Sequence, residues 1–169
     1  MYFVPVMTAR ANTPNSAELR FDSPEQELFL NLWRTYDRLR MLEDELFRRF
    51  DLTPQQYNVL RLLGAVFPRS IPTLVLAERL VSRAPDISRM LDKLEKRDCV
   101  LRSRPPENRR QVLVSLAPGG QELLAEIAEP LRSCHQKQLG HLSADTQRRL
   151  IELLQAARRP HEPAGSCWQ

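Results

Sequence analysis

The sequence predicts a mainly α-helical fold with one small β-hairpin, and three observations support this prediction. First, "SPEQ" and "TPQQ" each have a Ser or Thr directly before a proline and a Gln three residues after that Ser or Thr, which is the pattern that starts an α-helix. Second, apolar residues recur at helical spacing over most of residues 24–159. Third, the stretch 100–116 alternates apolar and polar residues around a proline-containing turn, "PPEN".

The bulk composition is that of a globular protein. The chain has 169 residues, of which 42% are hydrophobic and 27% are charged, and this fits one domain with extended arms. Residues 1–22 and 160–169 contain prolines and little periodicity, so we interpret them as an N-terminal arm and a C-terminal tail. No apolar run approaches the ~18 residues of a membrane helix, and no basic segment precedes "MYFVPVM". We therefore expect a cytoplasmic protein without a membrane contact.

The sequence gives no support for an enzyme. Only 5 glycines are present, which leaves little material for a phosphate-binding loop, and no nucleophile-elbow, zinc-protease or dinucleotide motif occurs. The three cysteines, Cys99, Cys134 and Cys167, share no metal-ligand spacing. We expect no catalytic residue, no metal and no cofactor.

The two start signals predict the first two helices. Ser23 caps the first and Gln26 reaches back to the cap, which predicts a helix over about 24–50. "TPQQ" repeats this capping box and predicts a helix over about 54–66. The first helix is apolar around much of its circumference, at Leu28, Phe29, Leu32, Trp33, Tyr36, Leu39, Met41, Leu42, Leu46, Phe47 and Phe50. Such a helix needs more than one packing partner, which this chain or a second chain could supply.

A pair of short helices follows. The first covers about 73–81, with Leu74, Ala77, Leu80 and Val81 expected to face inward. The second covers about 84–97, with Ile87, Met90, Leu91 and Leu94 facing inward at positions i, i+3, i+4 and i+7. Only "SRA" separates the two, which is the length of a helix-turn-helix connection. The outward face of the second helix presents Pro85, Asp86, Arg89, Asp92, Lys93 and Lys96.

The remainder of the chain predicts a hairpin and two more helices. "VLRSR", "PPEN" and "RRQVLVSL" predict a strand, a turn and a second strand. Pro118 opens a long helix that Pro130 is expected to bend. Ser143 caps the last helix, "SADTQRRLIELLQAARR".

The positive charge of the chain is concentrated. From Arg79 to Arg110 there are ten Lys/Arg and five Asp/Glu, a balance of +5, whereas the whole chain has a net charge of +4. A basic segment of this kind is typical of a protein that binds phosphate backbones. A solvated charged face is the alternative interpretation.

A helix-turn-helix followed directly by a hairpin is a winged helix, and each part suits DNA. The second helix of the pair fits the major groove, where Arg89 and Lys93 lie one turn apart on the outward face and Pro85 can contact a thymine methyl group. The hairpin, or wing, carries Arg109 and Arg110 near its tip, where they suit the narrow and negative minor groove. The alternative is that these two arginines are solvated or pair with acids of the same domain.

These residues resemble the MarR family of winged-helix regulators over about residues 24–159. The matching features are Ser88-Arg89 in the helix pair, Leu94-Glu95 before a turn, Asn108-Arg109-Arg110 in the wing, and Val114, Leu116 and Gly119 or Gly120 leading into the long helix. Three positions depart from the family pattern. Asn108 replaces a wing Asp that helps to hold the wing, Asp98 replaces a Gly after the second helix, and Ala117 replaces a capping Thr.

The resemblance implies a homodimeric, sequence-specific transcription regulator, a repressor that a small molecule releases from a pseudo-palindromic DNA operator. Residues 23–52 and 118–159 would form the dimerisation helices, and residues 53–117 the winged-helix lobe. The predicted DNA-binding residues are Arg83, Pro85, Asp86, Ser88, Arg89, Lys93, Arg109 and Arg110. A pocket for an aromatic or phenolic effector would be lined by Trp33, Tyr36, Arg40 and Tyr57, which could equally be core residues.

Besides a partner-binding module that has kept the fold and lost its DNA contact, two other functions stay open at this point. The first is an architectural DNA-binding dimer without a specific operator, which competition with random duplex would distinguish. The second is a redox-sensing regulator that acts through Cys134, which lies on the long helix near basic residues.

Overall fold

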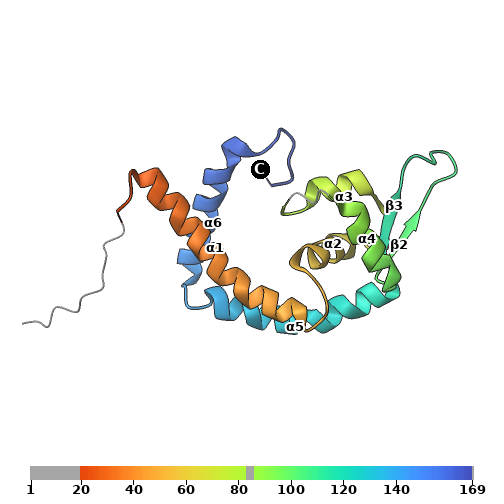
Figure 1. The fold of residues 1–169 in the computed structure, drawn as a ribbon, viewed down its shortest axis with the longest axis horizontal. Helices are drawn as coiled ribbons and strands as arrows, with labels where there is room; N and C mark the ends of the chain where they lie inside the picture. The colour runs from red at the N-terminus through yellow and green to blue at the C-terminus, as the bar shows by residue number, and fades with distance from the viewer. Residues whose placement is uncertain (1–19, 83–85, 169) are drawn as a thin grey trace, which may run out of the picture. The chain divides into compact units, whose positions relative to one another are not determined.

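The computed structural model describes residues 20–82 and 86–168, and it confirms a mainly helical fold with a small sheet (Figure 1). The elements are α1 (Pro24–Arg48), α2 (Pro54–Gly64), β1 (Ile71–Pro72), α3 (Thr73–Arg79), α4 (Ile87–Lys96), β2 (Val100–Ser103), β3 (Leu113–Leu116), α5 (Pro118–Leu139), α6 (Ala144–Arg158) and a 3-10 turn, η1 (Arg159–His161). The chain divides into two compact units, Met1–Tyr36 and Asp37–Gln169. Among the described residues, no helix is both long and apolar enough to cross a membrane.

The predicted helix starts are confirmed, with one correction. Thr53 forms a complete capping box: Gln56 N donates to Thr53 Oγ1 at 3.2 Å, and Thr53 N donates to Gln56 Oε1 at 2.8 Å. At the start of α1, Gln26 N donates to Ser23 Oγ at 3.2 Å, but Gln26 Oε1 accepts from Asp22 N at 2.7 Å instead of from the cap. The predicted capping box at Ser23 is therefore wrong in one of its two hydrogen bonds. Gln26 Oε1 accepts from the backbone amide of Asp22, one residue before the cap, and not from that of Ser23.

The sheet has one strand more than the sequence predicts. Its order is β1-β3-β2, and both pairs are antiparallel. The missed strand is two residues long and pairs Ile71 with Val114. Thr73 then ties the start of α3 to the hairpin, since its N and Oγ1 donate to Val112 O at 3.0 and 3.1 Å. The short strand β1 and the hydrogen bonds of Thr73 therefore connect the helix pair to the wing.

The core lies between the helix pair, α2, α5 and the sheet. On α4, Leu91 and Leu94 are 1% and 0% exposed, which confirms the predicted inward face. On α3 the prediction is partly wrong, because Leu74 and Val81 are 78% and 69% exposed. The helix ends at Arg79 and Leu80 is extended, so the helical period that placed Val81 inward does not continue. Leu76 and Leu80 take the buried positions.

The turn from α4 into β2 packs closely on the start of α5. Asp98 has a φ of 53°, the left-handed conformation that the family pattern gives to glycine. A Cβ on Gly119 would lie 2.7 Å from Asp98 O, and one on Gly120 would lie 2.2 Å from Cys99 O. Glycine is therefore required at both positions for α5 to approach this turn. As expected, Ala117 gives α5 no side-chain cap.

The last two helices differ in burial. The helix α5 continues through Pro130 and buries Ile127, Leu131 and Cys134. Ser143 caps α6 by accepting from Thr146 N at 3.2 Å, as predicted. No residue of α6 is buried, and Leu150, Ile151, Leu153 and Leu154 are 37–54% exposed.

Candidate nucleic-acid interface

The helix α4 presents an exposed cationic face. Asp86 precedes the helix, and its Oδ1 accepts from Arg89 N at 3.2 Å, so this carboxylate caps α4. Ser88, Arg89 and Lys93 are exposed. Within the parts of the chain that the structure describes, Arg89 and Lys93 form no ion pair. The predicted contacts Arg83 and Pro85 lie outside the described residues.

A shallow groove of about 320 Å³ runs along this face of α4 and reaches the start of α2. It is lined by Thr53, Gln56, Asp86, Arg89, Met90 and Lys93. Two of its lining residues are helix caps, Thr53 at the start of α2 and Asp86 at the start of α4. The groove adds Thr53 and Gln56 to the predicted surface, and the sequence identified these two residues only as a helix start.

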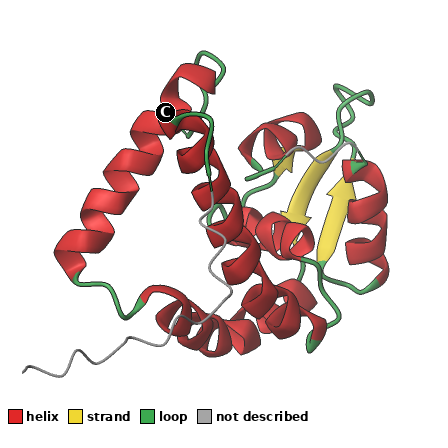
Figure 2. Ribbon diagram, turned by 60° about the vertical axis from the view of Figure 1, so that its left-hand side comes forward, coloured by secondary structure: helices red, strands yellow, loops and turns green. Residues whose placement is uncertain are grey.

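The wing places two free cations near its tip. Arg109 and Arg110 are exposed, and neither forms an ion pair with a described residue. The loop that holds them turns twice, through Asn108 N to Pro105 O at 3.1 Å and Gln111 N to Asn108 O at 3.0 Å. Arg104 Nη1 also donates to Arg109 O at 3.3 Å. Figures 1 and 2 show this loop extending beyond the helices around the sheet.

An arginine that the sequence analysis missed joins the wing to α4. Arg102 on β2 lies 2.6 Å from Asp92 Oδ1, and its Nε donates to Glu95 Oε2 at 3.0 Å. The hydrogen bond from Arg102 holds the pKa of Glu95 below its usual value, so the carboxylate stays ionised. These contacts hold the wing against the helix in a chain that has Asn108 in place of the family's wing acid.

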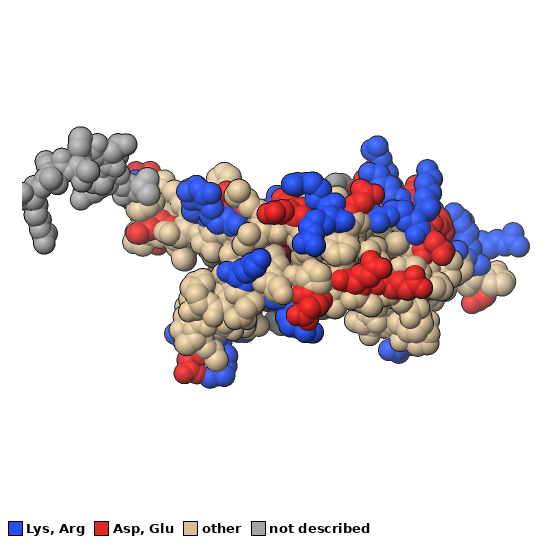
Figure 3. Space-filling view, turned by 90° about the horizontal axis from the view of Figure 1, so that it is seen from below, with Lys and Arg blue, Asp and Glu red and all other residues tan. Residues whose placement is uncertain are grey.

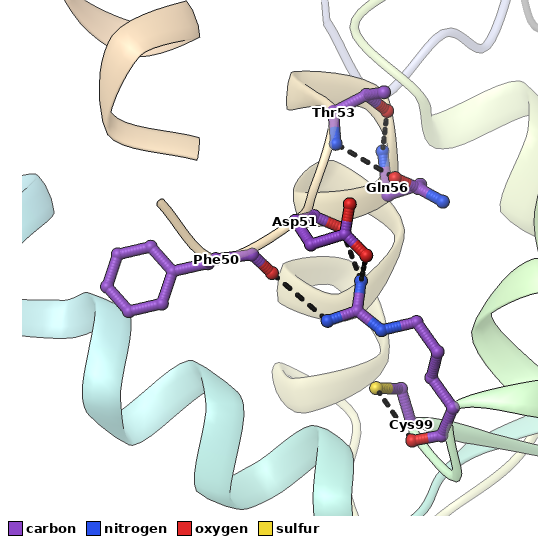
Figure 4. A network of polar contacts seen from close by, with 6 residues as sticks. Phe50, Asp51, Thr53, Gln56 and Cys99 are labelled. Carbon is purple, nitrogen blue, oxygen red and sulfur yellow. Dashed lines mark hydrogen bonds and ion pairs between the residues drawn. The ribbon is translucent and has the colours of Figure 1, made fainter. Parts of the chain in front are cut away.

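A second missed arginine ties the end of α4 to the segment between α1 and α2. Arg97 Nη2 donates to Phe50 O at 3.0 Å, Nη1 donates to Asp51 O, and the guanidinium also lies 3.8 Å from the Asp51 carboxylate (Figure 4). The thiol of Cys99 donates a hydrogen bond to Arg97 O at 3.4 Å. Burial raises the pKa of this thiol, which is consistent with a core position. Arg97 is therefore engaged within the protein.

Charged side chains of both signs lie around α4 and the wing. Figure 3 shows several Lys and Arg side chains at the end of the molecule that carries the wing, with Asp and Glu side chains between them. The acids near α4 are occupied: Asp86 caps the helix, and Asp92 and Glu95 pair with Arg102. Four of the residues predicted to contact DNA, Arg89, Lys93, Arg109 and Arg110, form no ion pair with a described residue.

The residues predicted to line an effector pocket make separate contacts. Trp33 lies on the unit that ends at Tyr36, where its ring centroid is 6.2 Å from that of Phe29, and both Trp33 and Tyr36 are exposed. Arg40 pairs with Asp44 at 3.2 Å. Tyr57 stacks on Phe47 at 4.8 Å, and burial raises the pKa of its phenol. Tyr57 is thus packed on the core, as the alternative interpretation expects.

Cys134 does not have the surroundings of a reactive thiol. Its side chain is buried on α5, and burial, followed by the charge of Glu43, raises its pKa. A redox-active cysteine needs a lowered pKa and access to solvent. The structure gives the redox alternative no support.

The comparisons with known proteins agree with this geometry. The MarR family model matches residues 52–112. An HTH-type transcriptional regulator of Bacillus cereus is 30% identical over 129 residues, which cover 75% of this chain and 84% of the relative. A MarR transcription factor from Planctomyces limnophilus is 52% identical, with a TM-score of 0.65 over 81% of this chain and 99% of that one. A mutant of Escherichia coli MarR solved with operator DNA is 26% identical, with a TM-score of 0.70 over 78% of this chain and 93% of that one.

The family match covers the helix pair and the first part of the wing, and the relatives extend the similarity to the flanking helices. The relatives and the fold are those of transcription regulators and not of enzymes. This chain therefore belongs to the MarR family of winged-helix transcription regulators.

Proposed function

We propose that this regulator binds a specific operator, with α4 in the major groove and the tip of the wing in the adjacent minor groove. The observation behind the proposal is a set of exposed cations that form no ion pair with a described residue, Arg89 and Lys93 on α4 and Arg109 and Arg110 on the wing. The major groove is about 12 Å wide and accepts one α-helix. Arg89 lies near the start of α4, where side chains reach base edges. Arginines on a thin loop suit the narrow minor groove.

The protein acts as a homodimer in this proposal. The support comes from α6, a 15-residue helix with no buried residue, on which Ile151 and Leu153 are 54% and 51% exposed. Further apolar side chains are exposed on α1, among them Leu28 and Phe29 at 59% and 62%. Apolar faces of this kind mark protein interfaces. Residues 23–52 and 118–159 would form the dimer, and residues 53–117 of each chain would contact one half-site.

The regulator represses transcription in the cytoplasm and is released by a small aromatic or phenolic effector. Trp33 and Tyr36 supply exposed aromatic surface on which an aromatic ring could stack. A thermal-shift screen of aromatic acids tests this part. A compound that raises the melting temperature and weakens DNA binding supports it, whereas one that does neither is not the effector.

Selection from a random duplex library tests the whole proposal. A dimer with two-fold symmetry should enrich a pseudo-palindrome whose half-site centres lie about 10–10.5 base pairs apart. Excess random duplex should then displace the selected duplex poorly at fixed salt concentration. An architectural DNA-binding dimer would enrich no sequence, and random duplex would compete as well as any selected one.

A further inference from the structure

A second cationic groove lies beside the groove under Arg89. It has a volume of about 670 Å³ and lies between the last turns of α1, the start of α2 and the second half of α4. Its charged lining residues are Arg40, Asp44, Arg48, Lys93, Lys96 and Arg97, together with Asp51. The two grooves share Thr53, Gln56 and Lys93. They therefore form one continuous surface that runs from the outward face of α4 to α1.

The net charge of this second groove is positive after internal pairing. Its two acids are both engaged, Asp44 with Arg40 at 3.2 Å and Asp51 with Arg97 at 3.8 Å. Among the residues that the structure describes, Arg48, Lys93 and Lys96 form no ion pair. Three unpaired cations on one open surface indicate a site for negative charge.

The cations of α4 form a row along the helix. Arg89, Lys93 and Lys96 follow each other at i, i+4 and i+7, so they lie on one side of α4. Seven residues of helix rise about 10 Å, whereas the major groove is about 12 Å wide. If Arg89 lies over the bases, the far end of this row is close to the phosphates at the groove edge. Arg48, on the opposite wall, extends the row onto α1.

We infer that Arg48 and Lys96 bind the DNA phosphate backbone beside each half-site, a contact that adds affinity without sequence preference. This inference rests on the proposed function. The lining of the groove includes no aromatic side chain, so it offers nothing on which an aromatic effector could stack. A row of separate cations on two helices matches a strand of regularly spaced phosphates.

The groove is held in shape before DNA arrives. Arg97 bonds the carbonyls of Phe50 and Asp51, which joins the end of α4 to the segment that follows α1 (Figure 4). The capping box of Thr53 and Gln56 fixes the start of α2 next to it. The walls that hold Arg48 and Lys96 are thus linked directly, and little ordering is needed on binding.

Adjacent arginines provide the test and its control. Arg48 lines the groove and Arg49 does not, yet both are exposed and neither forms an ion pair with a described residue. Arg48→Ala and Lys96→Ala should each weaken binding about tenfold near 0.1 M salt and lower the slope of log affinity against log salt by about 0.9. Arg49→Ala removes the same charge and should change both quantities much less. The loss should be equal on the selected duplex and on random duplex, because phosphates have no sequence.

The outcomes separate the inference from the proposed function. If Arg48→Ala and Arg49→Ala behave alike while Arg89→Ala still loses sequence preference, the phosphate contact is wrong and the proposed function stands. If the wild-type protein binds no duplex, both fail. If the groove variants keep their DNA affinity but lose thermal stabilisation by inorganic phosphate, the groove binds a small anion and the inference is overturned. Melting curves of the three variants should coincide with that of the wild type.

Discussion

The helices α4 and α6 are both amphipathic, but α4 buries its apolar face in the core and α6 leaves its apolar face exposed. On α4, Leu91 and Leu94 are 1% and 0% exposed, so the apolar face is covered within the chain. On α6, Ile151 and Leu153 are 54% and 51% exposed, so the apolar face is available to another molecule. The exposed face of α4 therefore presents charge, whereas that of α6 presents apolar surface. The first suits nucleic acid, and the second suits a protein.

The largest effect is expected where α4 meets the core. Leu94→Ala should lower the free energy of unfolding by about 2–5 kcal/mol, because it removes a fully buried side chain and leaves a cavity. Urea unfolding followed by circular dichroism measures this loss. A change below about 1 kcal/mol would mean that the apolar face of α4 is not covered as the structure has it.

The matched substitution on α6 sharpens the comparison. Ile151→Ala removes an exposed side chain, so its effect should appear in assembly. Sedimentation equilibrium should show a weaker dimer, and the melting temperature at micromolar protein concentration should be lower than that of the wild type. A wild-type protein that sediments only as a 19.6 kDa monomer at tens of micromolar would contradict the dimer.

The next effect concerns the wing. Replacing both Arg109 and Arg110 with Ala should weaken DNA binding by about 2–4 kcal/mol, as a double loss of charge-assisted contacts. The loss should be larger on duplexes with A·T-rich flanks, where the minor groove is narrow and more negative. The melting temperature should barely change, because both side chains are exposed and neither pairs with a described acid. A lowered melting temperature with a flank-independent loss would indicate a structural role instead.

The sequence predicted those parts of the winged-helix lobe, residues 53–117, that depend on local chemistry. The cap at Thr53, the buried pair Leu91 and Leu94, and the hairpin all follow from residues close together in the chain. The strand β1 was not predicted, because its two residues are too few to show the alternation of a strand. Val81 was predicted to face inward because the sequence has no signal for the end of α3 at Arg79, and Leu74 because helical spacing alone was used to place it.

The arginine contacts could not be predicted from local pattern. Arg97 and Phe50 are 47 positions apart, and their contact depends on how α4 packs against the end of α1. Arg102 and Glu95 are 7 positions apart, but a turn separates them, and only the fold places a strand residue against the helix. The charge count of residues 79–110 does not distinguish Arg97 and Arg102 from the other cations, whereas the structure engages both within the protein. The free cations of the candidate site are the ones that this pairing leaves.

The smallest effect concerns the contact between α4 and the wing. The pKa of Glu95 is held below its usual 4.5 by the hydrogen bond from Arg102, so the folded state binds this proton less tightly than the unfolded state. The resulting stability is present above about pH 4.5 and is lost as the pH falls through the lowered pKa. Glu95→Gln should cost at most about 1 kcal/mol at pH 7, because the pair is partly exposed, and should flatten the loss of stability in acid. Parallel acid unfolding curves would contradict this role.

We propose that the free cations on α4 recognise a specific DNA sequence, and the variant Arg89→Ala tests this most directly. The affinity of the variant for the selected duplex and for random duplex would be measured at one salt concentration. We predict a loss of about 1–3 kcal/mol on the selected duplex and a smaller loss on random duplex, so that base preference at the contacted position relaxes. An unchanged ratio of the two affinities would contradict the claim, because Arg89 would then contact phosphates and not base edges.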